Sequence, residues 1–290
     1  MTPTIELPPS PGYQVHHLDV QGVLRDSVEA LIAVEVDGAG PIPLAIAPHE
    51  SLMLSVQFGR GADPIEEKGE HGANTSLTGI RQWTGTFNGA GNCVSLFALL
   101  TPLGSVQLLD SQPLATVPRI RAPLAALLDR GLTRELESRI ALADGLDAKL
   151  GSFAAWLETR ATARRWQSSA ALRAGRAAMR LRAEPNRGVD EIADEQHISR
   201  RQLERDFQRW VGTSPRHLAQ VARVQHVSRM ARSGMSLAHV AADVGFADQA
   251  HMSRVVREMT GLTPLHFVRS QRTPLATGFR HATGGGTVYL

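Results

Sequence analysis

Cysteine is almost absent from this sequence: Cys93 is the single one among 290 residues. A lone cysteine excludes a disulfide framework and a zinc site built from several thiolates. The sequence also lacks a run of about 18 apolar residues, and its first residues show neither the basic nor the apolar segment of a secretion signal. We therefore expect a cytoplasmic protein with no membrane partner.

Lysine is missing from the second part of the chain, although arginine is abundant there. From Arg160 onward there are 21 arginines, no lysine and 10 acidic residues, a formal charge of +11. The preceding 159 residues carry 10 basic and 18 acidic residues, a formal charge of −8. Because DNA is a polyanion, this asymmetry indicates that only the C-terminal part contacts nucleic acid.

One pattern occurs twice in the C-terminal part, from Val189 to Pro215 and from Leu237 to Pro264. Each copy has an apolar residue followed by alanine, a tight turn, a second helix with an outward arginine, and a closing Gly-x-Ser/Thr-Pro. The first residues of the copies match at an offset of 48 and the last at 49, so the second copy has one extra residue in its turn. Two copies in register predict two helix-turn-helix motifs, in which the second helix enters the major groove.

The segment from about Gly188 to Arg269 resembles the paired helix-turn-helix domain of the AraC/XylS transcriptional regulators. The matching features are Ile192-Ala193, Ser199, Leu203, Arg205, Phe207, Gly212 to Pro215, Arg223-Val224, Val240-Ala241, Val244 to Phe246, Arg254 and Gly261 to Pro264. The resemblance implies a sequence-specific regulator of transcription, with activation as the expected effect. The expected partners are double-stranded DNA, a second copy of the chain, RNA polymerase and a small-molecule effector.

The resemblance also assigns DNA-binding residues in the first motif. Arginine suits the O6 and N7 atoms of guanine, and glutamate can accept a hydrogen bond from cytosine N4. A structural role for Arg205, in a salt bridge to the adjacent helix, is the alternative. The expected residues are Ser199 as N-cap, Arg200 and Arg209 as phosphate contacts, and Arg201, Glu204 and Arg205 as base readers.

In the second motif, Gln249, Ala250 and Arg254 fall on the family's base-reading positions. Glutamine suits adenine, alanine can touch a thymine methyl group, and arginine suits guanine. His251 either contacts a phosphate or packs at the rim of the motif, and we favour the packing role. A long helix from Pro215 to about Arg232 should join the two motifs rigidly, so that they occupy successive major grooves.

The complete chain is predicted to be an α+β protein. Short apolar runs, such as those over residues 30–36, 52–58 and 92–100, predict a β-rich effector or regulatory domain over residues 1–120, cupin-like or a small barrel. A helical connector follows over 121–162, then the paired helix-turn-helix domain over 163–272 and a flexible tail over 273–290. The apolar stripe of the connector, from Leu132 to Phe153, either forms a dimer face or packs on its own domain.

Two other functional classes compete with a regulator. One is a cupin-like enzyme domain fused to a DNA-binding domain, and the other is a DNA-alkylation repair protein that uses Cys93. The sequence has no spaced set of metal ligands, no Ser/His/Asp arrangement and no phosphate-binding loop. We therefore expect a protein that is not an enzyme, with no catalytic residue, metal ligand or cofactor.

Overall fold

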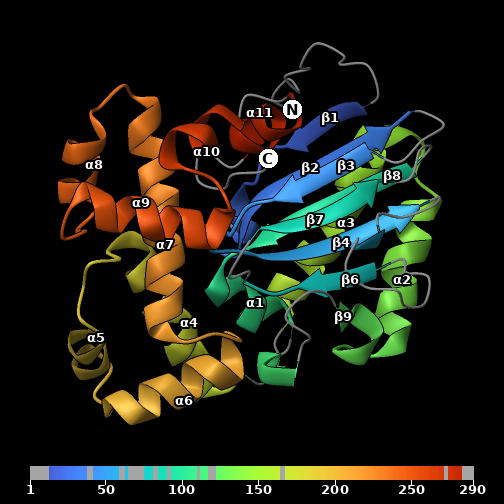
Figure 1. Cartoon of the computed structure of the whole chain (residues 1–290). Helices are drawn as coiled ribbons and strands as arrows, with labels where there is room; N and C mark the ends of the chain where they lie inside the picture. Colours follow the sequence, from blue (N-terminus) through green and yellow to red (C-terminus); the bar gives the residue numbers. More distant parts are fainter. Residues whose placement is uncertain are drawn as a thin grey trace.

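An antiparallel β region precedes a helical C-terminal region in the computed structural model, which is the expected α+β class (Figure 1). The structure describes residues 13–37, 42–58, 63–64, 75–80, 84–89, 93–109, 112–116, 122–163, 167–270 and 274–282.

The described strands are β1 (Tyr13–Leu18), β2 (Val28–Val36), β3 (Ile42–Ile46), β4 (Leu52–Phe58), β5 (Asp63–Pro64), β6 (Thr75–Thr78), β7 (Gly85–Gly89), β8 (Cys93–Leu100) and β9 (Ala122–Pro123). The α-helices are α1 (Pro102–Leu108), α2 (Arg130–Ala141), α3 (Gly145–Thr162), α4 (Ser169–Ala183), α5 (Val189–Glu195), α6 (Arg200–Trp210), α7 (Pro215–Arg232), α8 (Leu237–Asp243), α9 (Gln249–Thr260), α10 (Pro264–Ser270) and α11 (Pro274–Ala282). Three 3-10 helices lie between them: η1 (Gly22–Leu24), η2 (Leu114–Thr116) and η3 (Leu124–Ala126).

The described strands form two antiparallel sheets. The larger has the order β1-β2-β8-β4-β6-β9 and the smaller the order β3-β7-β5. The strands predicted around residues 30–36, 52–58 and 92–100 are β2, β4 and β8, and they form the centre of the larger sheet. Their continuous apolar runs suit strands that are covered on both faces.

Alternate residues of β2 show that both faces of the larger sheet are buried. Leu31 and Ala33 belong to an apolar cluster that continues through the helices, whereas Ile32 and Val34 belong to a second cluster on the other face. Successive side chains of a strand point to opposite faces, so these two clusters lie on opposite sides of the sheet.

The predicted flexible tail is wrong for residues 274–282. These residues form α11, which packs on β1 and β2. Phe279 is 3% exposed, and its ring centroid lies 5.6 Å from that of Phe97 on β8. The apolar side chains of Ala276 and Phe279 gain burial against the sheet, and this contact orders the segment. Residues 283–290 lie outside the described part.

The helical connector packs on its own domain. It contains α2 and α3, with Gly145 in the left-handed region (φ 78°) between them. Leu136, Ile140, Leu150 and Phe153 from the predicted stripe are each at most 1% exposed, inside the cluster that includes the sheet. These four side chains are covered within the described structure, which favours packing on the connector's own domain over a dimer face.

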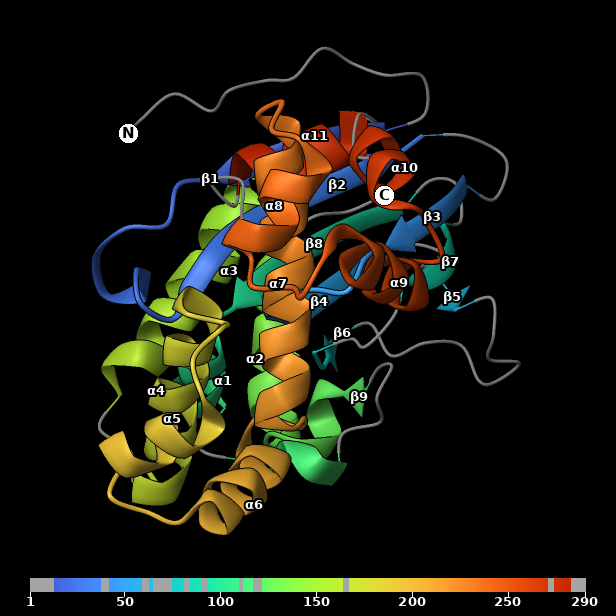
Figure 2. The ribbon, with the colours of Figure 1, turned by 60° about the vertical axis from the view of Figure 1, so that its left-hand side comes forward.

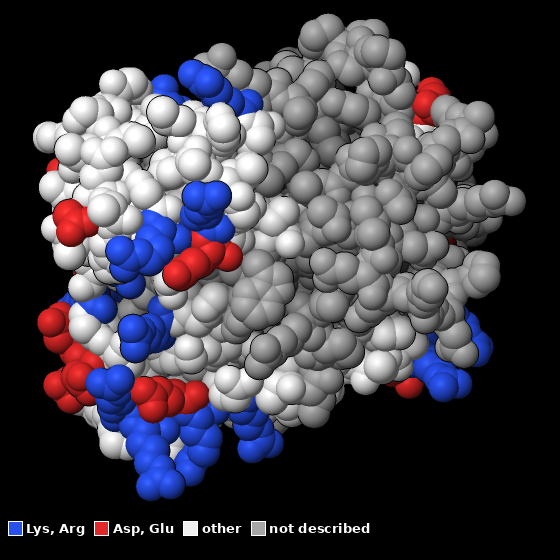
Figure 3. All heavy atoms as spheres, viewed as in Figure 1, with Lys and Arg blue, Asp and Glu red and all other residues white. Residues whose placement is uncertain are grey.

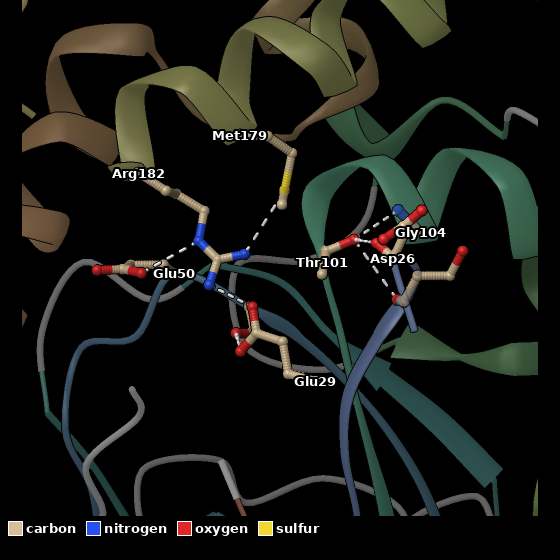
Figure 4. A network of polar contacts seen from close by, with 9 residues as sticks. Asp26, Glu29, Glu50, Thr101, Gly104, Met179 and Arg182 are labelled. Carbon is tan, nitrogen blue, oxygen red and sulfur yellow. Dashed lines mark hydrogen bonds and ion pairs between the residues drawn. The ribbon is translucent and has the colours of Figure 1, made fainter. Parts of the chain in front are cut away.

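Helix α4 joins the β region to the C-terminal helices through a buried arginine (Figure 4). Arg182 donates from Nε to Glu50 over 3.1 Å and also pairs with Glu29, which accepts a 2.6 Å hydrogen bond from the Ser51 hydroxyl. The side chains of Arg182, Glu29 and Glu50 are 15%, 16% and 8% exposed. Burial raises the pKa of Glu50, and the positive charges of Arg182 and Arg229 oppose that rise. The two regions therefore share a polar junction as well as an apolar cluster.

Candidate DNA-binding surface

Two helix pairs carry the repeated pattern, α5 with α6 and α8 with α9. In the first turn His197 adopts the left-handed conformation (φ 54°), and in the second Gly245 takes the equivalent place (φ 80°). After each turn a backbone hydrogen bond returns to the motif's alanine, from Ile198 N to Ala193 O and from Phe246 N to Ala241 O. The motifs differ by one residue, Ala247, which lies between that bond and the next helix. The predicted extra residue is therefore confirmed.

A side chain caps the second helix of each motif, and Ser199 is the cap expected from the sequence. The Ser199 hydroxyl accepts from Gln202 N over 3.2 Å, and the Asp248 carboxylate accepts from His251 N over 2.7 Å. Because each cap satisfies a backbone N–H that has no partner inside its helix, it fixes where α6 and α9 begin. The first turns of both helices are thus defined and face solvent.

The inward face of α6 is apolar and packs on α5. Leu203 and Phe207 are fully buried, in one cluster with Ile192 and Ala193 of α5. Their spacing of four residues places them on one side of the helix. The charged residues therefore occupy the remaining surface.

Five charged residues predicted to contact DNA on α6 are exposed: Arg200, Arg201, Glu204, Arg205 and Arg209. Arg200 pairs with Glu204 over 2.9 Å and with Asp190 over 3.2 Å. These contacts raise the pKa of Arg200, with the hydrogen bond to Glu204 as the largest cause. In this structure Glu204 is thus engaged by a neighbour on its own helix. Arg209 lies over the Trp210 ring, 4.7 Å from its centroid.

Arg205 donates a hydrogen bond to the side-chain oxygen of Gln202, one turn earlier on the same helix. The alternative prediction, a salt bridge from Arg205 to the adjacent helix, has no counterpart among its described contacts. The residue behind this contact, Asp206, was not predicted from the sequence. Its side chain is buried, 4% exposed, and pairs with Arg173 of α4. A charged residue three positions after Leu203, on the inward face, was the available signal, since a buried carboxylate needs partners.

On α9 the predicted base-reading residues Gln249, Ala250 and Arg254 are exposed. His251 is partly buried, and its ring meets the edge of Phe246 at 5.5 Å between centroids and 86° between planes. This contact is the packing role favoured for His251. Phe246 is itself buried, at 6% exposed.

The connecting helix has the predicted limits, Pro215 to Arg232. Figures 1 and 2 show α6 near one end of α7 and α8 near the other, with α9 at the height of the middle of α7. In the view of Figure 3, Lys and Arg gather on the side of the molecule where α6 and α9 lie, with Asp and Glu between them. A single continuous helix thus links two exposed, arginine-bearing helices.

Metal sites and membrane-spanning helices are not found among the described residues. No three of their His, Cys, Asp or Glu side chains are grouped as a metal site would need, and none of their helices has the length and hydropathy to cross a membrane. Cys93 is 4% exposed, and burial raises the pKa of its thiol, against the effect of a hydrogen bond with Ser95. A raised pKa leaves less of the nucleophilic thiolate, which disfavours the reactive-cysteine alternative.

A cavity of about 650 Å³ lies between the β1–η1 segment and α3. Leu24, Leu31, Leu150 and Ala154, all at most 9% exposed, provide its apolar lining, and the exposed Asp19 lies among its polar residues. Its size is in the range of small-molecule pockets.

Comparison with known proteins places the motifs in a family. Residues 192–270 match the family model described as "Helix-turn-helix domain". The HTH-type transcriptional regulator GbdR of Pseudomonas aeruginosa is 35% identical over 77 residues, which are 26% of this chain and 21% of that protein. The C-terminal helices form an AraC-type helix-turn-helix domain. Its matched range includes α6, α7 and α9.

The structural comparisons cover either this AraC-type domain or most of the chain. A probable AraC family transcriptional regulator from Rhodopseudomonas palustris is 25% identical, with 37% of this chain and all of that chain covered and a TM-score of 0.31. ToxT from Vibrio cholerae, solved with an unsaturated fatty acid, is 12% identical, with 89% of this chain and 95% of that chain covered and a TM-score of 0.42.

Proposed function

We propose that this protein is a sequence-specific DNA-binding regulator of transcription, whose helices α6 and α9 lie in successive major grooves of one site. One observation carries the proposal: two capped helices expose an arginine at equivalent positions, Arg205 and Arg254, and a single helix joins them. Grooves on one side of the duplex recur about every 10 base pairs, so one chain would read an asymmetric site of about 20 base pairs.

The base contacts follow from side-chain chemistry. Arg205 and Arg254 suit guanine, Gln249 suits adenine and Ala250 a thymine methyl group, while Arg201 supplies a further donor to the groove. Arg209, which stacks on Trp210, and Arg200 are assigned to phosphates. The pair with Arg200 engages one carboxylate oxygen of Glu204, so Glu204 is assigned to a base through its other oxygen.

Salt dependence tests the proposal on the full chain. Phosphate contacts release counterions, so affinity for a selected DNA site should fall roughly 100-fold or more between about 50 and 200 mM salt. Selection from a random DNA library should yield one extended consensus with two base clusters. Binding that is insensitive to salt, or a library without any consensus, would contradict the proposal.

The N-terminal region is proposed to carry the regulatory input. Its cavity beside α3 is the candidate effector site, and Gly151 offers a test because a Cβ there meets nothing within 4 Å. Gly151→Leu should therefore fold and project into the cavity, and it should abolish the thermal shift caused by a compound that stabilises the wild type by binding in this cavity. A compound that shifts both proteins equally binds elsewhere.

The finer parts of the proposal are a homodimer on DNA, activation through RNA polymerase, and residues 1–160 that bind no DNA. The acidic balance of those residues supports the last point. Light scattering of the full-length protein with its DNA site tests the dimer. One monomer on one site under every condition would refute it.

A further inference from the structure

A chain of hydrogen bonds runs from the back of the first motif to its exposed surface. Arg173 on α4 donates from Nη2 to Asp206 over 2.9 Å, and the other carboxylate oxygen of Asp206 accepts from Gln202 Nε2 over 2.6 Å. The Gln202 side-chain oxygen then accepts from Arg205 Nη2. Asp206 lies on the buried face of α6, whereas Arg205 is exposed.

The direction of each bond in this chain is fixed by the groups at its two ends. A carboxylate only accepts hydrogen bonds and a guanidinium only donates them. The amide of Gln202 must therefore turn its NH2 group to Asp206 and its oxygen to Arg205. Because Asp206 accepts the NH2 group at the buried end, the Gln202 oxygen is left to accept from Arg205 at the exposed end.

We infer that Asp206 and Gln202 are positioning residues that hold Arg205 ready to read its base. The inference rests on the proposed base-reading role of Arg205. Arginine has five N–H donors, so the bond to Gln202 leaves four for DNA. Holding a long side chain before binding lowers the entropy that recognition costs.

The second motif has no such arrangement. Matching Arg205 with Arg254, at the offset of 49, places His251 where the first motif has Gln202 and Val255 where it has Asp206. Val255 is apolar and 6% exposed, and His251 packs against Phe246. Arg254 therefore serves as an internal reference, since changes at Asp206 should leave its base preference alone.

Asp206→Asn should reverse the direction of the chain with a minimal change of shape. The oxygen of the new amide at position 206 would face the Arg173 donors, so its NH2 group would face Gln202. Gln202 would then turn its oxygen inward and present NH2 to Arg205, where two donors meet and Arg205 is released. We expect the preference at the base read by Arg205 to fall about 10-fold, toward the profile of Arg205→Ala.

A second substitution should restore the preference. When Gln202→Glu is combined with Asp206→Asn, the new carboxylate at position 202 accepts from the new amide at position 206 on one side and from Arg205 on the other. The net charge of this double variant equals that of the wild type. Base preference should return to within about twofold of the wild-type value. This remaining difference is much smaller than the discrimination that one bidentate base contact provides. Two exposed controls match the individual charge changes: Asp194→Asn on α5 and Gln208→Glu on α6.

The experiment is selection of DNA sites with the full-length variants, beside thermal unfolding of each. If Asp206→Asn does not fold, Gln202→Met replaces it, because it leaves the Arg173–Asp206 pair intact and should lose the same preference. A wild-type profile in the folded Asp206→Asn or Gln202→Met protein, or a folded double variant without recovery, overturns the positioning role alone. A wild-type profile in Arg205→Ala instead overturns the base-reading role on which the inference rests.

Discussion

The two helix-turn-helix motifs place an arginine at the same point of their second helix but are anchored differently. Apolar residues of α5 and α6 belong to one cluster with the sheet and with α4, whose Arg182 is held by Glu29 and Glu50. Residues of α8 and α9 form a separate cluster, and Ala47 is its one member from the β side among the described residues. In the described structure, a change in the N-terminal region would reach the first motif through its core, and the second through α7, Ala47 and the backbone hydrogen bond from Thr84 to Met259.

The largest expected effect concerns the junction that anchors the first motif. Arg182→Met should lower the free energy of unfolding by about 3–5 kcal/mol, because it removes the cation that pairs with the buried Glu50 and the partly buried Glu29. Urea denaturation of the full chain measures this change. The control is Arg180→Met, which removes the pairs of the exposed Arg180 with Glu184 and Glu195 and should cost at most about 1 kcal/mol. If both substitutions had equally small effects, the Arg182 junction would not anchor the first motif as described.

The turns offer a second contrast. Gly245→Ala should destabilise the protein by about 1–2 kcal/mol, because an L residue at φ 80° is strained and the new Cβ would meet the Asn186 side chain. His197→Gly should instead stabilise it slightly, by less than about 1 kcal/mol, since the release of strain is offset by a more flexible unfolded chain. Thermal unfolding distinguishes the two. Stabilisation by both substitutions would show that the second turn does not need glycine.

The helix between the motifs carries a pH-dependent group. Burial, with help from the charge of Arg229, lowers the pKa of His226 from 6.5 to about 4. The unfolded chain therefore takes up this proton before the folded one, so the free energy of unfolding should fall as the pH drops from about 6.5 toward 4. His226→Gln should lose less stability than the wild type between about pH 7.5 and pH 5, as measured by urea denaturation at each pH. Identical losses would contradict the lowered pKa.

The smallest expected effect is a loss of DNA affinity that is the same for all sequences. Arg209→Ala should weaken binding to all DNA sequences alike and reduce the slope of log affinity against log salt by about 1, because it removes one phosphate contact. Titrations with a selected site and an unrelated site provide the measurement. A loss confined to the selected site would make Arg209 a base reader instead.

Local signals in the sequence were sufficient to predict the two motifs and their boundaries. Ser199, Asp248 and Pro215 act within one turn of the helices they begin, so neighbouring residues alone determine where α6, α9 and α7 start. The strands β2, β4 and β8 were recognisable for a similar reason, as unbroken apolar runs.

Contacts between distant segments could not be predicted in this way. Arg182 and Glu50 are separated by 132 residues, and Arg173 and Asp206 by 33 residues on different helices. Helix α11 was missed because its stability depends on the contact of Phe279 with the sheet, while the glycines that follow it favoured a flexible tail. In each case the deciding partner lies far away in the sequence.

The most direct test of the account is the base-preference profile of the full-length protein beside those of Arg205→Ala and Arg254→Ala. We expect two base clusters about one helical turn apart, and each substitution should erase the preference at a different cluster at a cost of about 1–3 kcal/mol in specific binding. Profiles unchanged in both variants, or changed at the same position, would contradict a protein that reads DNA with two separate helices.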